Sequence, residues 1–166
     1  MVLIAPRQTL YMLQDFMVEQ YYQYTFIDEY SRFRYLEAFK EHSSYSSFVK
    51  HCAKRFPYTI ACVQTDNGAE FTNRLTSPKE DNPTLFEKTL AALGIRHKGP
   101  YTPRHNGKVE RSQRKDNEYF YASHKFYSFE DFKKQLAIRQ RQYNAFPMRP
   151  LNWNSPKDFL SAFSNL

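Results

Sequence analysis

The clearest pattern in this chain is an alternation of apolar and polar positions near its start. Residues 21–28 alternate and are rich in Tyr, Phe, Thr and Ile, which is typical of a half-buried strand. Residues 33–39 repeat the pattern after a short connection, so the two strands are predicted to form a hairpin. Upstream, residues 2–5 are predicted as a strand that Pro6 ends, and no clean period follows through residue 20.

Farther along, the period changes to that of amphipathic helices. Four segments are predicted as helices: 43–56, 83–93, 104–123 and 128–145. Pro57 ends the first helix, and Pro83 is expected at the first position of the second. Gly94 stops the second helix, and Ser128 caps the start of the last. With a short strand at 95–98, the order of elements predicts an α/β domain with a mixed sheet.

A buried strand is also predicted at 59–64, and it delivers Asp66 at its carboxyl end. The turn that follows reads Thr65-Asp66-Asn67-Gly68. In open α/β sheets, catalytic and binding residues gather at the carboxyl ends of strands, so Asp66 is a candidate catalytic residue. An ordinary surface turn is the alternative, because Asp-Asn-Gly is common turn chemistry. These four residues alone leave both interpretations open.

Composition limits the class of protein. The chain has 166 residues, 41% of them hydrophobic and 17% aromatic, which is enough for a single domain with its own core. Cys52 and Cys62 lack the spacing of a metal motif and are predicted to be small buried residues in a reducing compartment. No apolar run approaches the roughly 18 residues of a membrane span, so no membrane partner is expected.

Positive charge is concentrated in the second half of the chain. The formal net charge is +7, and residues 96–149 alone hold 13 Lys and Arg against 5 Asp and Glu. This surplus favours a polyanionic partner such as nucleic acid, although a membrane surface would satisfy the same charge.

Glu110 lies inside this basic region, on the predicted helix 104–123. An acid among cations stays ionised and can meet phosphates together with their metal ions. Taken alone, Glu110 is more simply explained as a surface residue paired with Arg114 one turn later. Four cations on this helix are predicted to contact DNA phosphates, with a solvated basic face as the alternative: Lys108, Arg111, Arg114 and Lys115.

Several of these stretches together resemble a known family. They are 65–68 with Glu70 and Phe71, 94–97, 101–103 with 105–111, and Tyr143 with Asn144. This set resembles the integrase catalytic core of bacterial insertion-sequence transposases of the IS3/IS481 type, which are related to retroviral integrases. The resemblance covers residues 21–160. It implies one catalytic core over 1–166, with an atypical first strand over 1–20, a C-terminal tail over 146–166 and a ribonuclease-H-like mixed sheet flanked by helices.

The resemblance also implies a chemistry. In the family, three carboxylates (D-D-E) hold two Mg²⁺ ions, with Mn²⁺ as a substitute, for in-line displacement at a DNA phosphodiester. Asp66 matches the second acid and Glu110 the third, so both are expected to be catalytic and to bind metal. The 43 residues between them (67–109) exceed the family's usual separation, and the predicted loop at 73–83 would hold the extra length.

The first acid is where the chain departs from the family. The first-strand pattern matches at Val2 and Pro6, which puts the acid's position at Met1. We therefore expect the first catalytic aspartate to be missing, through a late start, a frameshift or a truncation, and activity to be impaired. Asp28 is the obvious substitute but matches a position that the family does not use as a ligand, and Asp15 has no matching context.

Two classes of function remain. The leading one is an enzyme, a transposase or integrase core that cleaves and joins DNA strands during integration. The alternative is a catalytically degenerate DNA-binding or dimerisation module of the same fold. The expected partners are DNA (element ends and target), a second copy of the chain and an N-terminal DNA-binding region or partner outside it, in the bacterial cytoplasm at the nucleoid. His97 and His105 are predicted as surface or loop residues, with DNA contact as the alternative. Trp153 is predicted as a packing residue, with base stacking as the alternative.

Overall fold

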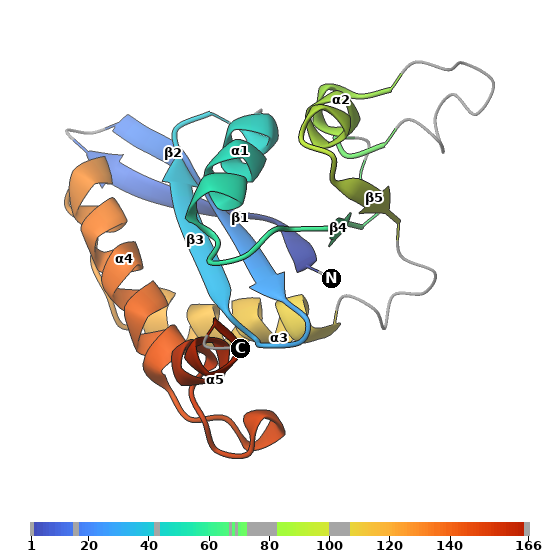
Figure 1. Cartoon of the computed structure of the whole chain (residues 1–166). Helices are drawn as coiled ribbons and strands as arrows, with labels where there is room; N and C mark the ends of the chain where they lie inside the picture. Colours follow the sequence, from blue (N-terminus) through green and yellow to red (C-terminus); the bar gives the residue numbers. More distant parts are fainter. Residues whose placement is uncertain are drawn as a thin grey trace.

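The computed structural model describes residues 2–14, 17–41, 44–66, 68, 70–72, 83–99 and 107–164. Its centre is a five-stranded mixed sheet with the order β3-β2-β1-β4-β5 (Figure 1). The strands are β1 (Val2–Gln14), β2 (Met17–Asp28), β3 (Arg34–Phe39), β4 (Cys62–Gln64) and β5 (Arg96–Lys98). β1, β2 and β3 pair antiparallel, whereas β4 runs parallel to both β1 and β5.

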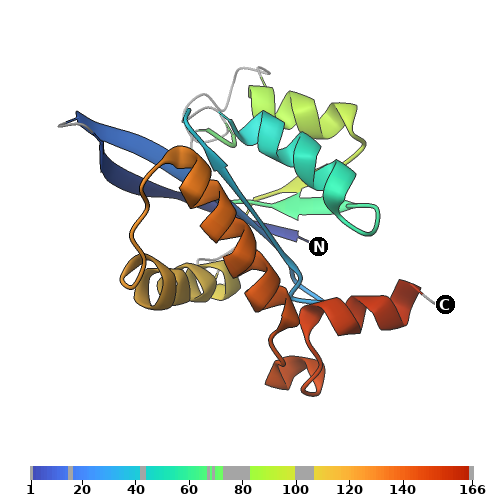
Figure 2. The same cartoon turned by 90° about the vertical axis from the view of Figure 1, so that its left-hand side faces the viewer.

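Helices cover both faces of the sheet (Figures 1 and 2). One face carries α1 (Tyr45–Arg55) and α2 (Leu85–Ala92), and the other carries α3 (Gly107–Asp116) and α4 (Phe129–Ala145). A π-helical segment, η2 (Asn117–Tyr121), prolongs α3. A 3₁₀ turn, η3 (Arg149–Leu151), leads to α5 (Pro156–Ser164), which contacts α4. None of the helices in the described ranges has the length and apolar character needed to cross a bilayer.

Each face of the sheet has its own aromatic core. The larger core lies under α1 and α2 and is centred on Tyr24, Phe26 and Phe48, which are fully buried. The smaller core packs Phe132 and Leu136 of α4 against the opposite face. Alternate residues of β2 therefore enter different cores, which explains why residues 21–28 of this strand are all buried.

The predicted hairpin is confirmed as β2 and β3, but the prediction for the first strand was wrong. Pro6 does not end it; β1 continues to Gln14. The pairing with β2 shifts register between Ala5 and Gln8. Proline lacks the N–H that a regular ladder needs, and a bulge accommodates it without ending the strand.

The predicted helices are present with small changes at their ends. Pro83 is not the first residue of α2, because Thr84 is its N-cap: the Thr84 hydroxyl accepts from the N–H of Glu87, and the Glu87 carboxylate accepts from the N–H of Thr84. This capping box satisfies two N-terminal groups at once. Ser128 caps α4 as predicted. Cys52 and Cys62 are buried free thiols. The predicted loop at 73–83 lies almost wholly outside the described residues.

A buried ion pair that the sequence analysis did not predict fixes α3 to the sheet. Arg34 of β3 donates to both carboxylate oxygens of Asp116, at 2.8 and 3.1 Å, and also to the hydroxyl of Ser112. Arg139 of α4 donates to Asp116 at 3.0 Å. Ser112 and Asp116 lie one turn apart on α3, so these bonds define how the helix is rotated against the sheet.

Candidate active site

The candidate site begins where β4 ends. Thr65 still behaves as a strand residue, since its N–H donates to the carbonyl of Lys98, and Asp66 follows it. Val63 belongs to the core under α1 and α2. Asp66 lies two residues past the end of β4, and continuing the alternation of the strand to this position would direct its side chain to the opposite side, the side of α3.

Asp66 has a second carboxylate beside it. The N–H of Gly68 donates to Oδ1 of Asp66 at 3.1 Å, which orients the acid. A Cβ added at Gly68 would lie 2.7 Å from Oε2 of Glu70 and 3.1 Å from Oδ1 of Asp66. The two carboxylates therefore converge on this glycine, and a larger residue there would displace the carboxylate of Glu70. Tyr45 of α1 donates to the other oxygen of Glu70 at 3.3 Å.

This arrangement changes the acidity of Asp66. Burial raises the pKa of Asp66, the hydrogen bond from Gly68 acts in the opposite direction, and the negative charge of Glu70 raises the pKa again. The net result is a raised pKa, because Asp66 is half-buried and also lies near a like charge, that of the exposed Glu70. A bound cation would relieve both effects. Glu70 was not predicted as part of the site; the only signal for it was an acid on each side of one turn glycine.

His97 supports the site from β5, and its prediction as a surface or loop residue was wrong. Its side chain is only 11% exposed. Nε2 is 2.9 Å from the hydroxyl of Thr65, and Nδ1 is 3.7 Å from a carboxylate oxygen of Glu87. The ring also packs edge-on against Phe86. His97 therefore holds the residue that precedes Asp66. His105 lies outside the described residues.

Glu110 is exposed in the first turn of α3. Its neighbour Val109 is fully buried against Ile27 of β2, which anchors this turn. Ile27 pairs with Leu3 of β1, and Leu3 pairs with Gln64 of β4. Along the strands, Val109 is therefore level with Gln64, two residues before Asp66.

The strand order limits how far apart Asp66 and the start of α3 can lie. β2, on which Val109 packs, and β4 are separated by two inter-strand spacings, about 10 Å. Across the described segments, however, no three His, Cys, Asp or Glu side chains gather closely enough to hold a metal ion.

The chemistry of these donors fits a hard divalent cation. Carboxylate oxygens are the ligands that Mg²⁺ prefers in proteins, and Mg²⁺ is commonly held by one or two carboxylates together with substrate phosphates and water. Asp66 and Glu110 match that minimal set, with Glu70 beside Asp66. The raised pKa of Asp66 means that metal binding would displace a proton more readily as the pH rises.

The predicted phosphate contacts divide into two groups. Lys108 already forms an ion pair with Glu29, with Nζ 2.7 Å from the carboxylate. Arg111, Arg114 and Lys115 are exposed on α3. Their role toward DNA stays a prediction.

Of the two candidate substitutes for the first acid, the structure describes one, Asp28. Asp28 accepts from the N–H and the hydroxyl of Ser31, both at 2.7 Å, so it closes the β2–β3 turn. Met1 and Asp15 lie outside the described residues. Continuing the β1–β4 pairing from Leu3 and Gln64 by two residues brings Ala5 level with Asp66.

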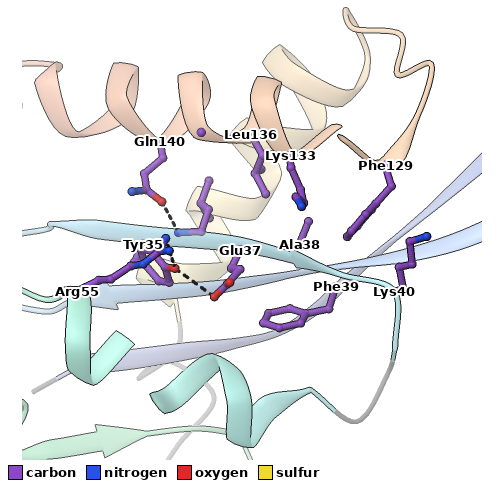
Figure 3. Close-up of a pocket in the computed structure, with 12 residues that line it drawn as sticks. Tyr35, Glu37, Ala38, Phe39, Lys40, Arg55, Phe129, Lys133, Leu136 and Gln140 are labelled. Carbon is purple, nitrogen blue, oxygen red and sulfur yellow. Dashed lines mark hydrogen bonds between the residues drawn. The ribbon is translucent and has the colours of Figure 1, made fainter. Parts of the chain in front are cut away.

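A separate groove lies at the far edge of the sheet, between β3 and α4 (Figure 3). Its volume is about 420 Å³. Gln140 reaches across it to accept from the N–H of Leu36, and Asn144 bonds to both the N–H and the carbonyl of Arg34. These two amides cover backbone groups that an edge strand would otherwise expose. The groove is remote from Asp66, because β3 and β4 are separated by two strands.

Comparison with known proteins concerns the fold that carries this candidate site. Residues 92–156 match the family model of the integrase core domain. The catalytic core domain of BIV integrase is 15% identical with a TM-score of 0.60, over 98% of this chain and 96% of that one. A chain of the simian T-cell lymphotropic virus intasome, solved with the PP2A regulatory subunit B56 gamma, is 19% identical with a TM-score of 0.57, over 86% of this chain.

This chain spans only 48% of that intasome chain. No sequence among the curated proteins is significantly similar to the sequence of the present chain. The similarity to the BIV integrase core shows that the fold is the ribonuclease-H-like fold of integrase catalytic cores, as predicted. At these identities the likeness concerns the fold and not the roles of single residues.

Proposed function

We propose that this integrase-like core is the catalytic core of a bacterial transposase that cleaves and joins DNA strands, with Asp66 and Glu110 as its carboxylates. The observation that supports the proposal is the strand pairing: Val109, the neighbour of Glu110, packs on Ile27, which is level through Leu3 with Gln64, two residues before Asp66. The match to the integrase core domain over 92–156 includes Glu110 and supports the same class of reaction.

In this proposal each residue near the site has a specific task. Asp66 and Glu110 would hold divalent ions, which when bound activate the attacking hydroxyl group and stabilise the leaving 3′-oxygen. The N–H of Gly68 orients the carboxylate of Asp66, and His97 holds the preceding Thr65. The exposed cations Arg111, Arg114 and Lys115 would bind DNA phosphates beside Glu110 and position the strand without reading its sequence.

Strand joining on a branched DNA substrate with Mn²⁺ tests the proposal. Asp66→Asn and Glu110→Gln should each lower the rate by about 10²-fold or more, since each removes charge that stabilises the transition state. The matched control is Glu118→Gln, an exposed acid two turns farther along the same helix. If both site variants join strands as fast as the parent chain, the proposal is wrong.

A second candidate is a DNA-binding module that has lost its chemistry. It is favoured by the absence of any three-ligand group among the described side chains. Ala5→Asp separates the two candidates because position 5 is level with Asp66. If the site is catalytic, a third carboxylate there should raise Mn²⁺-dependent joining, by up to about 10²-fold. If the module is degenerate, DNA affinity will be measurable and joining will stay absent in both chains.

The finer assignment is also part of the proposal. The motifs named above favour the IS3/IS481 type of insertion sequence, with element ends and target DNA as substrates. A homo-oligomer would bring two element ends together, and sequence-specific binding would come from another region or protein. The place of action would be the nucleoid.

A further inference from the structure

The turn between α4 and α5 displays the only tryptophan of the chain to solvent. Trp153 is 70% exposed, and Phe146 at the start of the same turn is 65% exposed. The prediction that Trp153 is a packing residue was therefore wrong. Figures 1 and 2 show this turn projecting from the lower end of the molecule, away from the sheet.

The backbone of this turn is strained where the tryptophan lies. Asn152 and Trp153 both adopt the left-handed conformation, with φ of 52° and 63°. Asparagine tolerates this conformation, but a bulky residue there costs about 1–2 kcal/mol. Because the Trp153 side chain is exposed, its packing offsets little of this strain. The fold is therefore less stable than it would be with a residue that tolerates the left-handed conformation here.

The strained conformation is held rigidly. The N–H of Met148 donates to the carbonyl of Asn154, and the N–H of Trp153 donates to the carbonyl of Met148. Leu151 is buried beneath the turn, and its carbonyl accepts from both the backbone and the side chain of Asn154. The indole is therefore presented from a fixed base, which lowers the entropic cost of binding a partner.

The charge around the turn favours an anionic partner. Residues 146–157 contain Arg149 and Lys157 and no Asp or Glu. The next acid, Asp158, accepts from the hydroxyl of Ser155 at the start of α5. A flat aromatic face flanked by cations is the arrangement that proteins use to stack nucleobases while neutralising the adjacent phosphates.

We propose that Trp153 is a stacking platform for an unpaired nucleobase, forming a second DNA contact away from Asp66 and Glu110. The DNA ligand rests on the proposed function, and the stacking rests on the exposed, strained indole. Every base has a π-face, so this contact would add affinity for single-stranded or frayed DNA without sequence preference.

The sole tryptophan makes the test direct. Its fluorescence, excited where tyrosine is silent, would be recorded during titration with a fluorescein-labelled oligothymidylate, and the anisotropy of the label would report binding independently. We expect quenching by the oligonucleotide and none by an abasic strand of equal length. If anisotropy shows binding and the tryptophan signal does not change, the inference is wrong and DNA binding stands.

Other outcomes are equally informative. If neither signal changes, both DNA binding and the stacking contact are contradicted. If emission shifts to the blue with protein concentration alone, the surface binds a second copy of the chain, and the inference is overturned.

Trp153→Gly separates stacking from a structural role. Glycine adopts a positive φ without strain, so this variant should unfold at a higher temperature than the parent chain and bind oligothymidylate about tenfold more weakly. Trp153→Phe should keep much of the affinity, and Tyr127→Ala, at an aromatic that is 77% exposed, should keep nearly all of it. A lower melting temperature for Trp153→Gly with unchanged DNA affinity would show that the ring is structural.

Discussion

Two aspartates of this molecule, Asp116 and Asp66, have opposite surroundings. Asp116 is fully buried and receives hydrogen bonds from two guanidinium groups, those of Arg34 and Arg139. Asp66 is half-buried beside another acid, Glu70, and its carboxylate accepts a hydrogen bond from the N–H of Gly68. The charge of Asp116 is compensated within the fold, whereas the described residues beside Asp66 add a like charge. The difference indicates that Asp116 is structural, and it is compatible with the proposed metal-binding role of Asp66.

Stability should separate the two aspartates most strongly. Asp116→Asn leaves two cations uncompensated and should cost about 3–5 kcal/mol of unfolding free energy. Asp66→Asn removes a destabilised charge and should leave stability unchanged or slightly higher. Both free energies can be measured by urea denaturation.

A matched control checks that this loss comes from burial. Replacing Lys133 by Ala removes the exposed ion pair Lys133–Glu130 and should lower the free energy of unfolding by less than about 1 kcal/mol. The double variant Arg34→Met with Asp116→Leu should recover much of the loss, because it leaves neither charge unpaired. Equal destabilisation by Asp66→Asn and Asp116→Asn would contradict the comparison.

A smaller effect should appear in pH dependence. The pKa of Asp66 is raised in the folded protein, so between the ordinary carboxyl value and this raised value the folded chain holds a proton that the unfolded chain has lost. Stability from this group is therefore lost as the pH rises through that window. Glu70→Gln removes one of the causes and should lower the pKa of Asp66, measured by NMR titration of its carboxyl carbon. A pKa of Asp66 unchanged in Glu70→Gln would show that the two carboxylates are not coupled.

Local patterns predicted much of the fold. Alternation identified β2 and β3, and helical spacing with Ser128 identified α4. The continuation of β1 past Pro6 could not be read, because the bulge that accommodates the proline depends on pairing with β2. Thr84 was missed as a cap because Pro83, the more familiar start signal, precedes it.

The long-range ion pair between β3 and α3 could not be predicted from the sequence. Arg34 and Asp116 are 82 residues apart, and each is an unremarkable charge in its own segment. Asp66 and Glu110 were predicted from motifs, and their joint role stays a prediction. The coupling of Glu70 to Asp66 depends on how the turn folds about Gly68, which no periodicity reveals.

Mn²⁺ binding is the most direct test of the central claim that Asp66 and Glu110 together form a metal site. Binding would be followed by water-proton relaxation, with a short DNA duplex present to supply phosphate ligands. The account predicts that Asp66→Asn and Glu110→Gln each weaken binding at least about tenfold, and that Glu118→Gln does not. Undiminished Mn²⁺ binding in both site variants would contradict it.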